Sequence, residues 1–312
     1  MLWSLHIVSI KLAAVSMIRN ECDILELFIR INSRIFDAIY IIDHLSSDGT
    51  PLIISELKKA GFPVGYCHLN SSEFNQGEIV TGLVRQLAEL NLYDYIMPLD
   101  ADEFLLVDSK SALEKVLKDS LAGNEFGLIP WKTFCPIADH YYHVESPLYD
   151  LFRARTEEPE QYYKVIIGNA YAKNCKVSLG SHSASNEATN CQPLTLPLTL
   201  AHVPIRSVNQ MINKVILGSH AFRHTSKRVP GQGFHWDLMA KLIREKDFEI
   251  AYDDIVEVAL RYAVSENSSA QTPSIDIDSA RIGLKADSIE FKKLAIVNNL
   301  KSFDDFMLNI KP

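Results

Sequence analysis

Residues 93–104 read YDYIMPLDADEF, a mostly apolar run that ends directly in two aspartates and a glutamate. A short apolar run bounded by polar residues is typical of a buried parallel strand. Asp100 and Asp102 are one residue apart, so their carboxylates point to the same side while the chain is still extended. The stretch therefore predicts a strand over 93–99 that carries an acidic pair at its carboxyl end.

The chain before this stretch alternates between short apolar runs and segments whose apolar residues recur at helical spacing. The apolar runs predict strands over 11–18, 38–42 and 62–68. The segments with helical spacing are 23–32, 51–60 and 78–90. Strands that alternate with helices predict an α/β fold with a mostly parallel central sheet flanked by helices.

Polar segments follow three of these strands: RNE at 19–21, DHLSSDGT at 43–50 and DADEF at 100–104. In open α/β sheets, ligands bind outside the carboxyl ends of the strands. A random scatter of acidic residues would not favour one edge, so these segments predict a ligand site there.

The chain after residue 104 loses this alternation. A short helix is predicted over 111–119, and strands over 126–131, 162–167 and 198–202. Helical patterns return over 238–246, 253–265 and 289–299. We therefore expect a boundary near Asp237, with an α/β domain over 1–236 and a C-terminal helical region over 237–312.

The composition narrows the range of functions. Lys and Arg number 31 against 39 Asp and Glu, and the formal net charge of -8 argues against nucleic acid as the main partner. The five scattered cysteines form no C-x-x-C pair, so neither a zinc knuckle nor a disulfide framework is indicated. No apolar run is long enough to span a bilayer. We expect a soluble cytoplasmic protein and leave open its peripheral attachment to the inner face of the cell membrane.

The acidic pair predicts a divalent cation site. Asp100 and Asp102 offer hard oxygen ligands, which select Mg²⁺ or Mn²⁺ over zinc. An ion held there would stabilise the negative charge of a departing diphosphate. The alternative is an acidic, solvated loop.

The second polar segment admits two interpretations. Asp43 ends a predicted strand, where a short acid can accept hydrogen bonds from a ribose hydroxyl or a base imide. Alternatively, the segment forms an Asx turn followed by a helix N-cap at Asp48 or Thr50. Both can hold for different residues.

The succession of motifs resembles the family 2 type glycosyltransferases of the GT-A fold, particularly a bacterial subgroup whose acidic motif reads D-x-D-E-F. The matching segments are MIRNECD at 17–23, IIDHLSSDGT at 41–50, LDADEF at 99–104, KVII at 164–167, GSH at 180–182, AHVPIRSVNQMINKVILG at 201–218 and GFHW at 233–236. The resemblance covers roughly residues 11–236. It implies a Rossmann-like catalytic domain over 1–236 and leaves the C-terminal helices uncovered.

The resemblance implies roles for individual residues. Those implied to bind the nucleotide sugar are Asn20, Glu21, Asp43, Asp48, Asp100, Lys164, Arg206, Lys214, Arg228 and His235. Asp100 and Asp102 would hold the metal, with His202 as the first choice and His182 as the second choice for a further ligand. A histidine ligand suits Mn²⁺ better than Mg²⁺. The alternative for either histidine is a core side chain bonded to the backbone.

Inversion at the sugar requires a carboxylate base. Asp139 and Asp237 are the candidates carried forward, and Glu145 and Glu187 lie in equally suitable segments. The basic segment 220–234, which includes Arg228, is expected either to fold over the donor diphosphate as a lid or to be an exposed loop.

These expectations together describe a metal-dependent hexosyltransferase. It would move a sugar from a nucleotide-diphosphate donor, by default a UDP-sugar, to the hydroxyl of a glycan or lipid-linked glycan. Surface polysaccharide or lipopolysaccharide synthesis is the expected setting. Two other classes stay open: a GT-A protein that binds a nucleotide sugar or glycan without catalysis, and a D-x-D phosphohydrolase.

Overall fold

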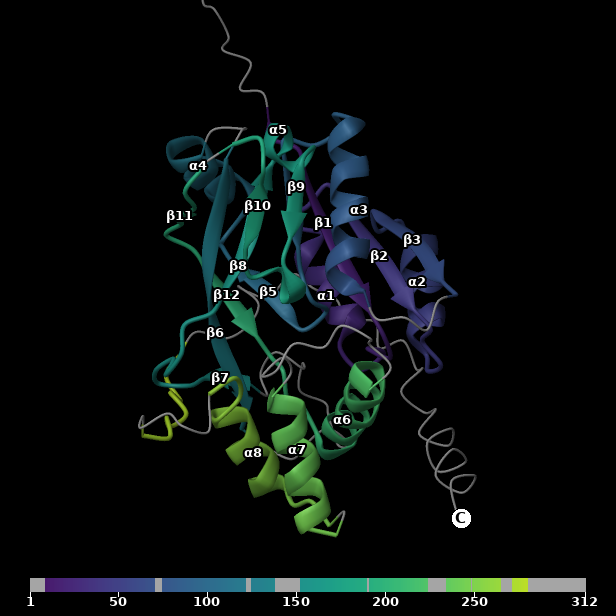
Figure 1. Cartoon of the computed structure of the whole chain (residues 1–312), viewed down its shortest axis with the longest axis vertical. Coiled ribbons are helices and arrows are strands. Elements are labelled where there is room, and N and C mark those ends of the chain that lie inside the picture. The colour runs from purple at the N-terminus through teal and green to yellow at the C-terminus, as the bar shows by residue number, and fades with distance from the viewer. Residues whose placement is uncertain are drawn as a thin grey trace, which may run out of the picture.

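The computed structural model describes residues 9–70, 75–121, 125–137, 152–189, 191–223, 234–247, 249–264 and 271–279. A twisted central sheet carries helices on both faces, and three further helices gather at one end of it (Figure 1). The α/β class expected from the sequence is confirmed. Among the described residues, no helix has both the length and the apolar character needed to cross a membrane.

The first half of the sheet is parallel, in the order β3-β2-β1-β4. Its strands are β1 (Leu12–Ile18), β2 (Ala38–His44), β3 (Val64–Leu69) and β4 (Tyr95–Pro98). The connecting helices are α1 (Leu25–Asn32), α2 (Thr50–Lys59) and α3 (Gln76–Glu89). The carboxyl ends of these parallel strands therefore lie at one edge of the sheet, as the sequence predicts.

The period of two along β1 explains why both faces of the sheet are covered. Leu12 and Ala14 belong to the core formed with α1 and α2, whereas Ala13 and Val15 pack in a second core with α3. All seven residues of β1 are buried. A strand buried on both faces explains the unbroken apolar run in the sequence.

The second half of the sheet is mixed. β8 (Tyr163–Gly168) runs antiparallel to β4, and the sheet continues through β6 (Phe126–Pro136), β12 (Thr199–His202) and β5 (Glu103–Leu106). The short strands β7 (Phe152–Ala154) and β11 (Leu194–Thr195) also pair with β6. β9 (Cys175–Val177) and β10 (Ala184–Asn186) form a separate pair.

The remaining helices are α4 (Lys110–Ser120), α5 (Asn169–Ala172), α6 (Val208–Arg223), α7 (Phe234–Glu245) and α8 (Tyr252–Leu260), with a 3-10 turn at Leu179–Ser181. The sequence predicts α4, α7 and α8 but neither β5 nor α6. The predicted helix over 289–299 lies outside the described residues.

The domain boundary near Asp237 stays a prediction. The packing shows whether the helices after it have a core of their own. Asp237 lies within α7. Met239 and Ile243 of α7, and Ile255 and Ala259 of α8, are buried in the same core as α1 and the sheet. The described C-terminal helices therefore share their core with the α/β domain.

We predict that Phe28→Ala lowers the free energy of unfolding by about 3–5 kcal/mol, because it removes a large buried ring. Phe28 is fully buried and meets Phe104 edge to face at 6.5 Å between ring centroids. Leu52→Ala, at a side chain 48% exposed on α2, serves as the control and should change the value by about 0.5 kcal/mol or less. Equal losses in urea melts of the two variants would contradict this packing.

Candidate active site

The acidic pair lies in a tight turn between β4 and β5. The N–H of Asp100 donates to Glu103 Oε2 at 2.8 Å, and the N–H of Glu103 donates to the carbonyl of Asp100 at 3.1 Å. The fully buried Glu103 therefore closes the turn that presents Asp100 and Asp102. Glu103 lies within the D-x-D-E-F motif, but its role in closing the turn is not evident from the sequence.

Lys164, near the start of β8, is the partner of this turn. Its buried Nζ donates to Asp100 Oδ2 at 2.6 Å and to the carbonyl of Gly180 at 2.8 Å, and it lies 2.8 Å from Glu103 Oε2. Burial lowers the pKa of Lys164, but the two carboxylates outweigh it and raise the pKa above its usual value. The ammonium therefore stays charged.

Gly180 explains the GSH motif. Its φ of 69° lies in the left-handed region that favours glycine. A Cβ there would also come within 2.5 Å of Nε2 of His182. The glycine thus lets its carbonyl reach Lys164 while the imidazole packs against the turn.

Glu103 differs from the neighbouring Asp102 in the direction of its pKa shift. Burial raises its pKa to about 8, and the charge of Lys164 opposes this only in part. Within the described part of the chain, its Oε1 has no hydrogen-bond partner. Glu103 is therefore a carboxyl group that takes up a proton near neutral pH.

Asp102 remains ionised. Its side chain is almost fully buried, with Oδ2 at 2.7 Å from Lys214 Nζ and 3.5 Å from Arg206 Nη1. Burial alone would raise its pKa, but the positive charges of Lys214 and Arg206, with the hydrogen bond from Lys214, lower the pKa well below its usual range.

Arg206 connects this cluster to the loop after β1. Its Nε donates to Asp23 Oδ2 at 2.7 Å, and its Nη2 donates to Glu21 Oε2 at 2.6 Å. Burial raises the pKa of Glu21 to about 7, against the opposing charges of Arg206 and Lys214. The guanidinium, predicted as a phosphate ligand, is buried and occupied here by carboxylates.

The loops after β1 and β2 are joined by hydrogen bonds. Asn20 Oδ1 accepts from the N–H of Ser47 at 2.7 Å, and the N–H of Asn20 donates to Ser46 Oγ at 2.9 Å. The N–H of Glu21 donates to Thr50 Oγ1 at 3.0 Å. The structure thus brings together the first two predicted polar segments.

The carboxylates of Asp43 and Asp48 both accept hydrogen bonds that stabilise the loop after β2. Asp43 is fully buried, and its carboxylate accepts from the N–H of Ser46 at 2.9 Å and from the hydroxyl of Tyr66 at 3.0 Å. Asp48 accepts from the N–H of Thr50 at 2.9 Å. The N-cap position of α2 is Gly49, next to the two residues predicted for it.

His202 is the predicted ligand that lies nearest to Asp102. Its Nε2 is 3.8 Å from Asp102 Oδ1, a separation too long for a hydrogen bond. The ring stacks on Trp131, with centroids 4.3 Å apart, and meets the edge of Tyr262 at 5.3 Å. Burial lowers the pKa of His202 well below its usual value, so the ring is neutral. Trp131 is a core residue here, only 5% exposed.

His182, the second choice of ligand, faces elsewhere. Its Nδ1 lies 2.9 Å from the carbonyl of Tyr163, and its ring packs on the edge of Trp131. Burial, followed by the charge of Lys164, lowers its pKa. In this structure His182 is therefore a core side chain bonded to the backbone, which is the alternative to metal binding given above.

Of the four predicted metal ligands, Asp102 and His202 are the pair whose side chains face each other. No cluster of three or more His, Cys, Asp or Glu side chains among the described residues is arranged as a metal site. Asp102 Oδ1 and His202 Nε2 face each other at 3.8 Å, and these two atoms would be the ones to hold a cation. His202 Nδ1 is buried without a hydrogen-bond partner in the described chain.

Several predicted residues lie outside the part of the chain that the structure describes. Asp139, Glu145 and Arg228 are among them, as is most of the predicted lid. His235 and Asp237 fall in α7, but its side chains are described only from Met239 onward. Glu187 is described and lies exposed, beside β10.

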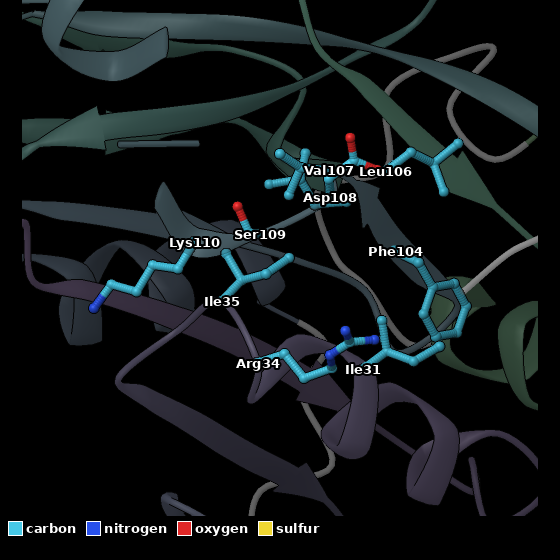
Figure 2. Close-up of a pocket in the computed structure, with 10 residues that line it drawn as sticks. Ile31, Arg34, Ile35, Phe104, Leu106, Val107, Asp108, Ser109 and Lys110 are labelled. Atoms are coloured by element: carbon cyan, nitrogen blue, oxygen red, sulfur yellow. The ribbon is translucent and has the colours of Figure 1, made fainter. Parts of the chain in front are cut away.

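A small hollow of about 140 Å³ lies behind the acidic turn, between α1, β5 and the start of α4. Figure 2 shows Ile31, Arg34 and Phe104 on one side of it, with Lys110 reaching away. Nζ of Lys110 is bound to Asp37 Oδ2 at 2.6 Å. None of the predicted site residues lines this hollow.

No protein-family model matches the chain, and no curated protein does. Among solved structures, the chain resembles S. aureus TarS with a TM-score of 0.33 and 13% identity, over 78% of this chain and 44% of that one. It resembles the mannosyltransferase PcManGT from Pyrobaculum calidifontis, solved with GDP-Man and Mn²⁺, with a TM-score of 0.40 and 10% identity, over 80% and 78%.

A third likeness is to mannosyl-3-phosphoglycerate synthase from Rubrobacter xylanophilus, with a TM-score of 0.27 and 20% identity over 40% of this chain and 41% of that one. The chain thus spans less than half the length of TarS and of this synthase. Likenesses this low assign neither an activity nor a substrate to the chain.

We predict that Glu103→Gln changes how stability depends on pH. Because the folded state holds the Glu103 proton more tightly than the unfolded chain, its contribution is complete below about pH 4.5 and is lost as the pH rises through 8. The unfolding free energy of the wild type minus that of the variant should therefore fall by roughly a few kcal/mol across this window. Urea melts at several pH values measure the difference, and a constant difference would refute the assignment.

Proposed function

We propose that the protein is a metal-dependent glycosyltransferase of the GT-A type. It transfers a sugar from a nucleotide-diphosphate donor, with a UDP-sugar as the first choice, to a hydroxyl acceptor. The observation that carries this proposal is the cluster at the carboxyl edge of the sheet, where the acidic turn meets three buried or half-buried cations. The expected setting is surface polysaccharide or lipopolysaccharide synthesis.

Asp100 is the member of the cluster that a donor can reach. Its side chain is 34% exposed, whereas the Lys164 side chain behind it is fully buried. Gln76, the first residue of α3, donates to Asp100 Oδ1 at 3.2 Å, so the amino end of α3 also lies at this point. A helix amino end and a fixed ammonium both favour an anion such as a diphosphate.

A metal is proposed to bind Asp102 and His202, with Mn²⁺ favoured over Mg²⁺ by the imidazole. When bound, it would supply positive charge to the leaving diphosphate. Lys214 and Arg206 hold Asp102 in place and keep it ionised.

The loops after β1 and β2 are proposed to bind the nucleoside. Asn20 and the Ser46–Asp48 turn lie at the surface end of these loops, and hydrogen bonds fix their backbones against each other. Because the carboxylate of Asp43 is committed to Ser46 and Tyr66, we propose that it shapes the nucleoside site from beneath. Asp139 and Asp237 remain the candidate bases for inversion.

We predict that Asp102→Asn abolishes Mn²⁺-dependent release of UDP from UDP-sugars, because the amide cannot neutralise or hold the cation as a carboxylate does. Asp119→Asn, on the exposed face of α4, is the matched control and should behave like the wild type. Thermal melts with UDP and Mn²⁺ measure binding separately from turnover. Undiminished release by Asp102→Asn, or equal release in excess chelator, would overturn the metal-dependent mechanism.

We predict that His202→Ala weakens Mn²⁺-dependent binding of UDP about 10-fold or more, and metal-free UDP binding much less. Calorimetry with and without Mn²⁺ separates the two effects. His182→Ala is the comparison, because its ring is bonded to the Tyr163 carbonyl and not to Asp102. If both titrations weakened equally in His202→Ala, the histidine would be structural.

A further inference from the structure

A tyrosine from the C-terminal region lies inside the candidate site. Tyr262 follows α8 and is only 8% exposed. Its ring meets His202 edge to face, with centroids 5.3 Å apart and an interplanar angle of 68°. Nothing in the sequence patterns of residues 253–265 marks this position, because it lies within an ordinary helical pattern.

A buried arginine fixes the backbone of this tyrosine. Arg155 is fully buried, and its Nη1 donates to the carbonyl of Leu260 at 2.9 Å and to that of Tyr262 at 3.1 Å. The guanidinium is ion-paired with Glu158. Removing Glu158 would leave an uncompensated buried charge, which is strongly unfavourable, so the guanidinium stays beside these two carbonyls.

The Arg155–Glu158 pair is also bonded to the strand that lies next to His202. Glu158 accepts from the N–H of Thr133 at 2.6 Å and from its hydroxyl at 3.2 Å. Thr133 on β6 is the register partner of His202 on β12. The position of Tyr262 relative to His202 is therefore set through a single stretch of sheet.

The described residues 271–279, farther along the chain, are hydrogen-bonded to residues at and just after β7. The N–H of Thr156 donates to the carbonyl of Ser274 at 2.8 Å, and that of Asp276 donates to the carbonyl of Ala154 at 2.8 Å. Figure 1 shows this end of the described chain beside β7, next to α8. Tyr262 thus sits in a segment that is held to the sheet on both sides.

Three groups together determine the orientation of the His202 ring. Trp131 stacks on its face at 4.3 Å, Tyr262 meets it edge-on, and Asp102 lies 3.8 Å from its Nε2. The charges of Lys214 and Asp102 also act on the phenol of Tyr262, whose pKa is raised to about 12, chiefly by burial. The phenol is therefore neutral and adds no charge to the cluster.

We propose that Tyr262 is a positioning residue of the site: its ring holds the His202 imidazole with Nε2 towards Asp102, and Arg155 places Tyr262 there. The inference rests on the proposed role of Asp102 and His202 in metal binding. It makes the α8 segment part of the catalytic unit, so that the α/β region over 1–236 lacks one of the groups that orient its own metal ligand.

The test compares Mn²⁺ binding by electron paramagnetic resonance in the full-length, nucleotide-free protein and its variants. Tyr262→Leu removes the aromatic edge and should weaken Mn²⁺ binding about 10-fold. Tyr262→Phe keeps the ring and should bind like the wild type. Tyr252→Phe is the matched control on α8, since its hydroxyl donates to the Pro136 carbonyl, and it should change nothing.

A second measurement needs no variant. Nuclear Overhauser contacts between the Tyr262 and His202 rings should be present in the metal-free wild type, as the 5.3 Å edge-to-face arrangement requires. Their absence would overturn the proposal even if Tyr262→Leu failed to fold. Wild-type Mn²⁺ affinity in folded Tyr262→Leu would also overturn it, as would a loss in Tyr262→Phe equal to that in Tyr262→Leu.

The outcomes separate this inference from the proposed function. If the wild type binds no Mn²⁺, the metal mechanism itself fails. If the wild type and folded Tyr262→Leu bind it equally well, only the positioning role fails, and Asp102 and His202 keep theirs.

Discussion

The neutralisation of buried carboxylates at the carboxyl edge of the sheet is the constraint on which the structure depends. Asp102 and Glu103 are at most 3% exposed, and burying such groups without partners is very unfavourable. Lys164 comes from β8 and Lys214 from α6, both far away in the sequence. Because β8 lies beside β4, Lys164 reaches the acidic turn. Lys214 of α6 reaches the same turn, and the two lysines supply the positive charge that the carboxylates require.

Arg206 extends the same constraint to the loop after β1. It contacts carboxylates of the loop after β1 and of the acidic turn, so these two segments are held at a fixed separation. A ligand that brings its own charge into this network competes with existing ion pairs. Under the proposed function, the phosphates of a donor would contact the lysines of this network and a cation would be held by its carboxylates.

The N-terminal half could be predicted from the sequence because its signals are local. Long apolar runs such as residues 11–18 alternate with amphipathic helices, and each element is decided by its own residues. β5 was missed because it has only four residues and begins inside the polar motif, at Glu103. Its strand character comes from pairing with β12, where Phe104 opposes Ala201, and that pairing cannot be read locally.

The candidate site shows the same division between local and distant information. The sequence placed Asp100, Asp102 and His202 in one site, and the structure brings Asp102 and His202 to face each other. It could not show that Glu103 closes the acidic turn, since that depends on a backbone N–H. Nor could it show that Tyr262 reaches His202, because the contact depends on Arg155 and on the register of β6 with β12.

The location of a bound cation tests this account most directly. Anomalous diffraction from crystals grown with Mn²⁺ and UDP would locate the ion independently of any activity assay. The account predicts a peak in contact with both Asp102 and His202, with the UDP diphosphate beside Asp100. A peak held by other side chains, or ordered UDP at this edge without any ion near Asp102, would contradict it.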